Sequence, residues 1–314
     1  MSEPMTGHLD GTGAPAPAGG RRALKMMSRR TYLQEATLRT IFMLCAIVAV
    51  AAVALILVFV GWRGWPVVRD PGIVAFLFGR EWSASNDMFG ILPLISGTVV
   101  VTIGALLIGA PLAVGTAVFL SEIASPRVRS IVRPAVEMLA GVPSVVFGFF
   151  GLVILRPLVA DLTGGMGFGP LTASLILAVM IVPTIATLTE DALGSVPGGI
   201  RHASYAMGAT TWQTIYKVLL PAAKIGIIDA IILGMGRAIG ETMAVVMVAG
   251  NAPQFFQGLG EPVSTLTSQI VIDMSYASGT HRTALFGMAV ILFLMSMGLV
   301  ATVRGLSRLS KREM

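Results

Sequence analysis

Two ionisable side chains stand inside one of the most apolar stretches of the sequence. The segment GMGRAIGETMAVVMVAGN, residues 234–251, carries Arg237 and Glu241 four positions apart. On a continuous helix this spacing places both side chains on one face, where they can reach each other. A charge at bilayer depth costs at least about 2.5 kcal/mol, so something must offset that cost. The spacing predicts either a structural ion pair or an oxyanion site, in which Arg237 binds the anion and Glu241 holds the guanidinium in place.

Hydroxyl side chains on neighbouring apolar segments could also meet an anion. Thr98 and Thr102 are spaced to line one helical face, and so are Thr184 and Thr187. Alternatively, these hydroxyls donate to carbonyl groups of their own helices, which is the more frequent arrangement. Ser144 closes a Gly-Val-Pro-Ser break, which marks either a cavity-lining backbone or an ordinary proline kink. The predicted substrate path therefore consists of Arg237, Glu241, Thr98, Thr102, Ser144 and Thr184.

Glycine spacing in the first segment predicts close helix packing. Gly236 and Gly240 form a GxxxG motif, which lets two helices approach closely because neither residue has a side chain. We expect this face to contact another helix of the chain or a partner subunit.

The sequence lacks the motifs of an enzyme. A phosphate-binding Walker A loop needs Gly-Lys before Ser or Thr, and none of the lysines follows a glycine. There is no HExxH motif, and the three histidines are too scattered to form a metal site. The single cysteine, Cys45, permits no intramolecular disulfide. We expect no catalytic residue, no metal and no cofactor bound by this chain, so that any ATP hydrolysis occurs in a separate subunit.

Composition places these residues in a membrane. Of the 314 residues, 55% are hydrophobic and 12% are charged, whereas soluble domains carry about 25% charged residues. A spanning helix needs about 20 mostly apolar residues, and six segments qualify: 40–61, 95–120, 136–158, 171–189, 222–250 and 285–304. The sequence therefore predicts an all-α membrane protein with six transmembrane helices.

The distribution of lysine and arginine sets the expected orientation. Cytoplasmic segments carry an excess of these residues, and most of the 22 fall before the first span, in 122–134, after the fourth span and in the C-terminal tail. Both termini are therefore expected in the cytoplasm of a multi-pass cell-membrane protein. The net charge of +6 reflects topology and lipid contact and not nucleic-acid binding. Residues 62–94, rich in Trp and Phe, are expected outside, with aromatic side chains at headgroup level.

Four parts follow from these patterns. The Gly/Pro/Ala-rich start has too few bulky apolar residues to fold. We expect a disordered and basic cytoplasmic segment at 1–39, the first transmembrane helix and an outer loop at 40–94, a transmembrane core at 95–304 and a cytoplasmic tail at 305–314.

The longest inner segment, residues 190–221, is too polar to cross a membrane. Its apolar residues nevertheless recur at roughly helical spacing. A Pro-Gly-Gly break precedes them and Pro221 ends them. We expect a short helix, a turn at Gly208 and a second short helix across the cytoplasmic face. An ordinary interfacial linker is the alternative.

The same segment carries a family resemblance. The spacing of Ala203, Ala206 and Gly208, followed by Leu220 and Pro221, resembles the EAA signature of ABC importer permeases, with Ala203 or a neighbour replacing the usual Glu. Further stretches resemble the PstC-type permease subunits of phosphate ABC importers: PLISGTVVVT (93–102), FLSEIASPRVRS (119–130), EMLAGVPSVVFGFFG (137–151), AVMIVPTIATLTEDAL (178–193) and GRAIGETMAVVMVAGN (236–251). The resemblance covers about residues 40–304.

The resemblance implies a type I ABC importer permease fold and an assembly. The chain would form the translocation path with a sister permease of the PstA type. Its 190–221 loop, with the five signature residues, would couple to a dimer of cytoplasmic ATPases that use ATP and Mg. An extracytoplasmic phosphate-binding protein would dock near 62–94 and 251–284. The implied function is permease subunit of an ATP-driven phosphate importer.

Three alternatives stay open. Arg237 alone cannot distinguish tetrahedral anions, so the substrate could be sulfate or molybdate. A secondary transporter or channel would use Glu241 as a proton carrier, although it would not need the 190–221 loop for an ATPase. A regulatory membrane scaffold would sense phosphate through its partners without transporting it.

Overall fold

The computed structural model describes residues 29–70 and 72–309. Most of the predicted N-terminal segment, and the end of the predicted C-terminal tail, lie outside these residues. Six helical segments are long and apolar enough to cross a membrane, which confirms the all-α fold and the number of spans. They are Thr37–Val68, Leu92–Ile123, Ser144–Thr163, Pro170–Gly194, Thr211–Gly240 and Gly279–Gly305.

The chain divides into two compact units, Met1–Leu55 and Ile56–Met314. α1 (Arg29–Gly64) begins in the first unit and ends in the second; it is helical from Arg29, before the predicted span at 40–61 and the observed span from Thr37. In the second unit, α13 (Gly279–Leu309) continues into the predicted tail. Apolar side chains dominate both helices, which are therefore suited to lipid or to other helices.

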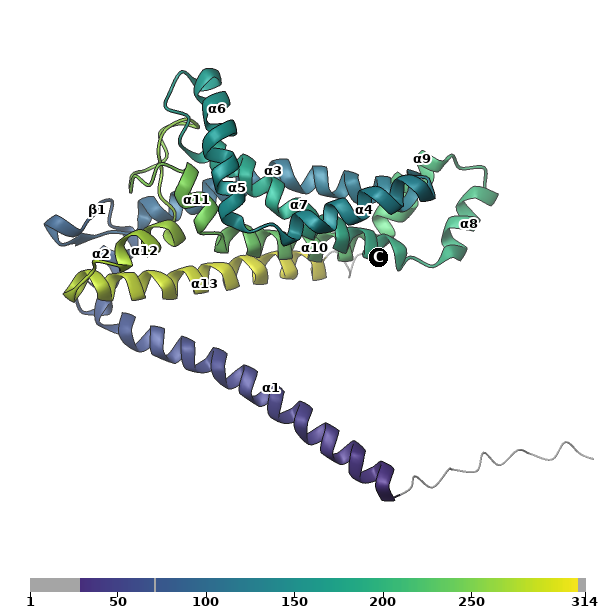
Figure 1. Cartoon of the computed structure of the whole chain (residues 1–314), viewed down its shortest axis with the longest axis horizontal. Coiled ribbons are helices and arrows are strands. Elements are labelled where there is room, and N and C mark those ends of the chain that lie inside the picture. Colours follow the sequence, from purple (N-terminus) through teal and green to yellow (C-terminus); the bar gives the residue numbers. More distant parts are fainter. Residues whose placement is uncertain (1–28, 71, 310–314) are drawn as a thin grey trace, which may run out of the picture. The chain divides into compact units, whose positions relative to one another are not determined.

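Three long helices form the centre of the second unit (Figure 1). α3 (Leu92–Val118), α7 (Pro170–Gly194) and α10 (Leu220–Gly240) pack against one another. Small residues let the backbones approach: a Cβ added to Gly234 would lie only 2.5 Å from the side chain of Ile185. Close packing of this kind holds helices together in lipid, where apolar burial gives little driving force.

The third span is interrupted, which corrects its predicted position at 136–158. α4 (Pro126–Gly141) ends before the extended pair Val142–Pro143, and α5 (Ser144–Phe150) begins after it. The residue before a proline is disfavoured in the helical region, so the helix cannot run through. The span itself consists of α5, a π-helical stretch at 151–155 and α6 (Arg156–Thr163).

The predicted second short helix of the 190–221 segment is instead the beginning of the fifth span. α8 (Gly198–Ala206) is the first short helix, and the chain turns at Gly208, which has a φ of +81°. α9 (Thr211–Thr214), a π-helical stretch at 215–219 and α10 then form one continuous segment. Pro221 is the second residue of α10 and directly follows the π-helical stretch, so the helical segment runs through this proline.

The end of the second unit opposite α8 is built from short elements, and we call it the hairpin end. Three of its aromatic side chains, Phe76, Trp82 and Phe89, are buried. The predicted headgroup position is therefore wrong for them, although Trp62 and Trp65 are exposed. The short elements are a 3-10 turn (Trp65–Val68), α2 (Ile73–Phe78), β1 (Trp82–Ser83), a 3-10 turn (Ala84–Asn86), β2 (Met88–Phe89) paired antiparallel with β1, α11 (Met243–Val248) and α12 (Leu266–Met274).

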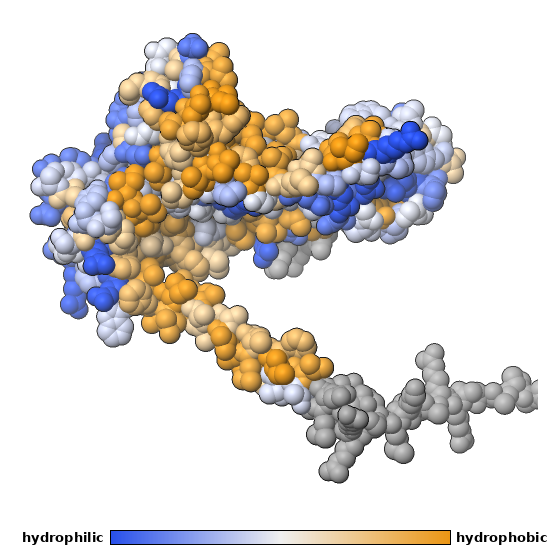
Figure 2. All heavy atoms as spheres, viewed as in Figure 1, coloured by the Kyte–Doolittle hydropathy of each residue, from blue (hydrophilic) through white to orange (hydrophobic). Residues whose placement is uncertain are grey.

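Side-chain hydropathy separates the middle of the second unit from its ends. Figure 2 shows hydrophobic side chains over α5 and α6, and mostly hydrophilic ones at the hairpin end and around α8. Large apolar side chains of the third span are exposed, among them Val146, Phe149 and Val153. Exposed apolar area of this kind marks a surface that contacts lipid or another subunit.

Candidate functional site

Arg237 lies in the last turn of α10 and contacts α7. Its Nη1 donates a 3.2 Å hydrogen bond to the hydroxyl of Thr184, near the middle of α7. Thr184 is therefore the predicted path residue that the structure brings to Arg237. Within residues 37–70 and 72–305, no carboxylate forms an ion pair with this guanidinium. The hydrogen bond described for Arg237 goes to a neutral partner.

The predicted ion pair between Arg237 and Glu241 is wrong, because the helix ends between them. α10 stops at Gly240, and Glu241 has an extended backbone with φ −71° and ψ 130°. The Glu241 carboxylate accepts the N–H of Ala244 at 3.3 Å, and its carbonyl accepts the hydroxyl of Thr267 at 3.0 Å. Pairing at i, i+4 requires an unbroken helix. Glu241 instead supports the start of α11 and connects the break to α12.

Gly236 and Gly240 do not pack against this chain. No atom lies within 4 Å of a Cβ built at either residue. Helix packing within the chain falls to Gly234, which faces Ile185. The predicted packing of Gly236 and Gly240 thus finds no partner among the described residues. Together with the exposed Arg237, they form an open face of α10 that another subunit or an aqueous path can occupy.

The remaining predicted path residues do not gather around Arg237. Thr98 and Thr102 are buried. The Thr98 hydroxyl donates to a carbonyl one turn earlier at 2.8 Å and accepts the N–H of Leu266 at 3.0 Å, so it ties α3 to the start of α12. Thr187 likewise donates to its own helix at 2.9 Å. Ser144 is the half-buried first residue of α5.

The α8 region exposes several large side chains within a mostly hydrophilic surface. Ala203, Ala206 and Gly208 are all exposed there, whereas the other two signature residues lie in α10. Large side chains surround them, with exposed fractions of 41% for Tyr205, 87% for Met207, 66% for Trp212 and 64% for Tyr216. Such side chains are typical of the anchors in protein interfaces. A capping box between Thr210 and Gln213 holds the turn that presents them.

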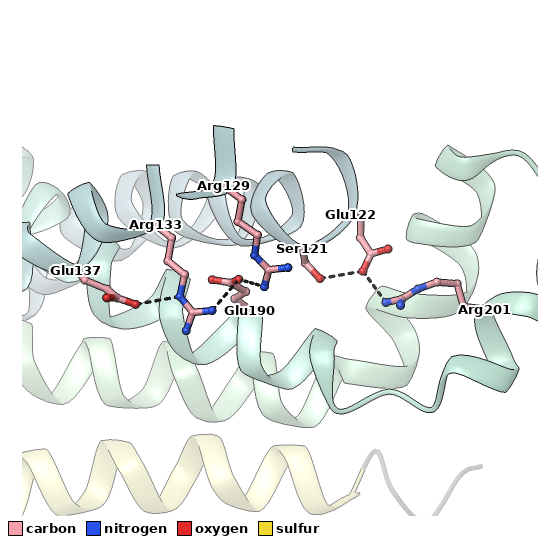
Figure 3. Close-up of polar contacts among 7 residues, drawn as sticks. All are labelled: Ser121, Glu122, Arg129, Arg133, Glu137, Glu190 and Arg201. Atoms are coloured by element: carbon pink, nitrogen blue, oxygen red, sulfur yellow. Dashed lines mark hydrogen bonds and ion pairs between the residues drawn. The ribbon is translucent and has the colours of Figure 1, made fainter. Parts of the chain in front are cut away.

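A cluster of ion pairs lies next to this surface, and the sequence did not predict it (Figure 3). Glu190 of α7 has a side chain only 5% exposed and pairs with two arginines of α4, Arg129 at 2.5 Å and Arg133 at 3.5 Å. Arg133 also pairs with Glu137 at 3.0 Å. The hydrogen bond to Glu137 and the charge of Glu190 raise the pKa of Arg133 further above its ordinary value. In the sequence, Glu190 directly follows the predicted fourth span at 171–189, and nothing local to it indicated the pairing.

A second pair joins α8 to the end of α3. Arg201 of α8 donates to the carboxylate of Glu122 at 2.7 Å, and the Glu122 side chain is only 6% exposed. Ser121 donates to the same carboxylate oxygen at 2.8 Å. Glu122 lies in a π-helical stretch, residues 119–123, that continues α3. Figure 3 shows both clusters along the inner face of α4 and the end of α3.

At the hairpin end, one buried carboxylate joins β1, α12, α13 and the connection between the two helices. Asp273 of α12 accepts hydrogen bonds from Trp82 at 2.9 Å, Gln269 at 2.9 Å, Tyr276 at 2.5 Å and His281 at 3.0 Å. Burial alone would raise the pKa of Asp273, but the hydrogen bonds outweigh it and lower the pKa below its ordinary value. The bond to Asp273 raises the pKa of Tyr276 to about 12. In the part of the chain that the structure describes, no group of three or more His, Cys, Asp or Glu side chains could hold a metal ion.

Comparisons with known proteins agree with this architecture. The family model "Binding-protein-dependent transport system inner membrane component" matches residues 105–313. The chain is 38% identical to the "Probable ABC transporter permease protein YqgH" of Bacillus subtilis, over 88% of this chain and 91% of that protein. It is 36% identical to the "Phosphate transport system permease protein PstC" of Pasteurella multocida, over 76% of this chain and 81% of that protein.

The fold is also found in a solved structure. A chain of a bacterial alginate ABC transporter, in complex with an alginate pentasaccharide-bound periplasmic protein, superposes with a TM-score of 0.60 at 16% identity, covering 89% of this chain and 95% of that one. At this identity the likeness shows the fold alone. The predicted resemblance to PstC-type permeases is confirmed by the sequence relatives. The chain belongs to the family of binding-protein-dependent transport system inner membrane components.

Proposed function

We propose that this chain is the permease subunit of an ATP-driven importer of inorganic phosphate. The support comes from the similarity to PstC-type permeases over most of the chain and from six apolar spans. Its role is to form the translocation path and not to catalyse a reaction. ATP and Mg are used by separate ATPase subunits.

The observation that carries the proposal is the environment of Arg237. A guanidinium within a spanning segment is expensive to keep, and its hydrogen bond to Thr184 supplies no opposite charge. It also lies on the open face of α10. A passing oxyanion supplies the missing charge, and the planar fork of donors matches phosphate oxygens.

The α8 region is the proposed contact with the ATPases. Its exposed side chains at one end of the spans include Tyr205, Met207, Trp212 and Tyr216, which are of the kind that anchors protein interfaces. A sister permease, an ATPase dimer and an external phosphate-binding protein complete the proposed assembly. The binding protein docks at the hairpin end, on the side opposite α8.

The proposed orientation places both termini and α8 in the cytoplasm. Cys45 is the only native cysteine, so a Cys45→Ala background allows single-cysteine labelling. Ser85 and Ser195 are both exposed and lie at opposite ends of the second unit. A membrane-impermeant thiol reagent applied outside cells should label Ser85→Cys and spare Ser195→Cys. The reverse pattern would overturn the orientation.

Transport by the reconstituted complex tests the proposed function. Proteoliposomes containing both permeases and the ATPases should take up labelled phosphate only with the binding protein and ATP. Unlabelled phosphate should compete, whereas sulfate and molybdate should not. Arg237→Gln should lower uptake at least about tenfold, equivalent to losing a charge-assisted hydrogen bond, and Arg237→Lys should restore little of it.

Other outcomes of the same assay would identify the alternatives. Uptake that ignores ATP and follows a proton gradient would indicate a secondary transporter. Competition by sulfate or molybdate would indicate a different oxyanion. An assembled complex without any uptake would indicate a regulatory scaffold.

A further inference from the structure

One segment of the chain is held by ion pairs from two directions. Residues 119–129, which we call the α3–α4 corner, comprise the π-helical end of α3, a short connection and the beginning of α4. On one side, Glu122 of the corner pairs with Arg201 of α8. On the other side, Arg129 of the corner pairs with Glu190 of α7. Figure 3 shows the two pairs on neighbouring turns of the same stretch.

Both acids are buried, which makes their partners necessary. The exposed fractions of the Glu190 and Glu122 side chains are 5% and 6%, whereas those of their arginine partners are 44% for Arg129 and 31% for Arg201. A buried carboxylate that loses its partner is strongly unfavourable. The pairs therefore resist separation of the elements that they join, although they leave the arginines in contact with solvent.

The connection from α8 to the corner is polar. No residue of α8 is buried, so the helix has little apolar contact to hold it in place. Its side chains are tied by the bond from Arg201 to Glu122 and by a 2.9 Å bond between the hydroxyls of Ser204 and Thr214. The second bond reaches Thr214 of α9, at the beginning of the fifth span, and not α3. The Arg201–Glu122 pair is thus the described side-chain link from α8 to α3.

We propose that the α3–α4 corner transmits movement of the α8 region to the inner ends of α3 and α7. Arg201 and Glu122 fasten α8 to α3, and Arg129 and Glu190 fasten the corner to α7. A displacement of α8 then moves α3 and α7 with it, instead of only changing the conformation of the loop that contains α8. This inference rests on the proposed ATPase contact of α8, and it makes these four side chains positioning residues for coupling.

Neutral substitutions test the link without leaving a buried charge unpaired. In the complex, the double variant Glu122→Gln, Arg201→Gln should assemble and hydrolyse ATP. The stimulation of its ATP hydrolysis by the phosphate-loaded binding protein should fall roughly fivefold or more, as expected for loss of a coupling between sites. Arg127→Gln is the matched control, because Arg127 lies two residues from Arg129 and forms no ion pair with a described residue. It should keep the parental stimulation.

A covalent replacement of the ion pair separates coupling from folding. In a Cys45→Ala background, Glu122→Cys with Arg201→Cys removes the pair, and stimulation should be lost while the thiols are free. A bis-methanethiosulfonate reagent, whose spacer stands in for the two long side chains, should restore it in the assembled complex. Parental stimulation in the neutral double variant, or failure of complete cross-linking to restore stimulation, would overturn the inference.

The ATPase readout distinguishes this inference from the proposed function. Phosphate uptake by the parental complex decides whether the chain serves a phosphate importer. The response of ATP hydrolysis to loss of the Glu122–Arg201 pair decides whether the corner transmits movement. If the parent imports phosphate and Arg201 proves dispensable for stimulation, the corner fails while the proposed function stands.

Discussion

The indole N–H of Trp82 donates a hydrogen bond to a carboxylate oxygen of Asp273, which lies 191 residues away in the sequence. The bond joins the hairpin after the first span to the helix before the last one. Tyr276 and His281 bind the same carboxylate, and the His281 ring stacks on Phe89. A single acidic side chain thus holds together the surface that we propose for docking of the binding protein.

Asp273→Asn should destabilise the hairpin end. The amide presents an N–H group where an acceptor is needed and loses the charge that strengthens these bonds, at a cost of about 2–3 kcal/mol. The melting temperature of the purified chain in detergent, followed by tryptophan fluorescence, should fall. Glu81→Gln is the control, since Glu81 is exposed next to Trp82 and should leave the melting temperature unchanged. Equal melting temperatures of the Asp273→Asn and Glu81→Gln variants would contradict the assigned role of Asp273.

The same cluster predicts how stability depends on pH. Because hydrogen bonding lowers the pKa of Asp273, its contribution is complete above its unfolded pKa of about 3.9 and is lost as pH falls through the lower folded pKa. The pKa of Tyr276 is raised to about 12, so its contribution is complete below its unfolded pKa of about 10 and is lost as pH rises through the folded value. Melting curves should show both losses, and Tyr276→Phe should remove the alkaline one.

Arg237 and Glu241 should behave as independent residues. They do not pair, because α10 ends at Gly240 and the Glu241 carboxylate binds the backbone of Ala244. In a double-mutant cycle with Arg237→Gln and Glu241→Gln, the effects on phosphate uptake should add within about 0.5 kcal/mol. A coupling energy well above that value would show that Arg237 and Glu241 interact, and it would contradict their independent roles.

Gly208→Val should uncouple the α8 region. A φ of +81° is open to glycine and strained for a β-branched residue, so the turn between α8 and α9 must change. The complex should assemble and lose the stimulation of its ATPase activity by the binding protein. Gly199→Ala is the matched control, because Gly199 is exposed in helical backbone with nothing within 4 Å of an added Cβ. If the Gly208→Val complex kept full stimulation of its ATPase activity, the α8 region would not be the contact that couples to the ATPases.

Two glycines of α10 should respond differently to substitution. Gly234→Ala places a methyl group against Ile185 at 2.5 Å and should destabilise the isolated chain by about 1–3 kcal/mol, as overpacking does. Gly236→Ala meets no atom of the residues that the structure describes and should leave the isolated chain as stable as the parent. Thermal melting of both variants in detergent gives the comparison. Similar destabilisation by both would mean that the open face of α10 is covered within the chain.

The sequence predicted the elements that depend on local pattern. Six apolar runs became six spans, and the short helix and the turn at Gly208 lie where spacing and glycine placed them. The sequence-based prediction was wrong where a helix ends inside an apolar run, because hydropathy does not indicate such an end. The apolar run through 222–250 hides the end of α10 at Gly240, and Pro221 was taken as a stop although the helical segment runs through it.

The candidate site was less predictable, because its contacts join distant parts of the chain. Arg237 was recognisable as a charge within an apolar segment, but its bond to Thr184 depends on how α7 packs against α10. Glu122 and Glu190 stand just after predicted spans, and their arginine partners lie 79 and 61 residues away. Spacing along a single helix cannot reveal such pairs.

The break after Gly240 also has a consequence for how the protein is made. α11 has six residues, far fewer than the 20 or so that a helix needs to enter a bilayer by itself. It packs against α5, α7 and α12, so its binding surface exists only once the third and fourth spans are in place. Because α12 follows α11 in the sequence, α11 can complete its packing only after the chain beyond the fifth span has been synthesised.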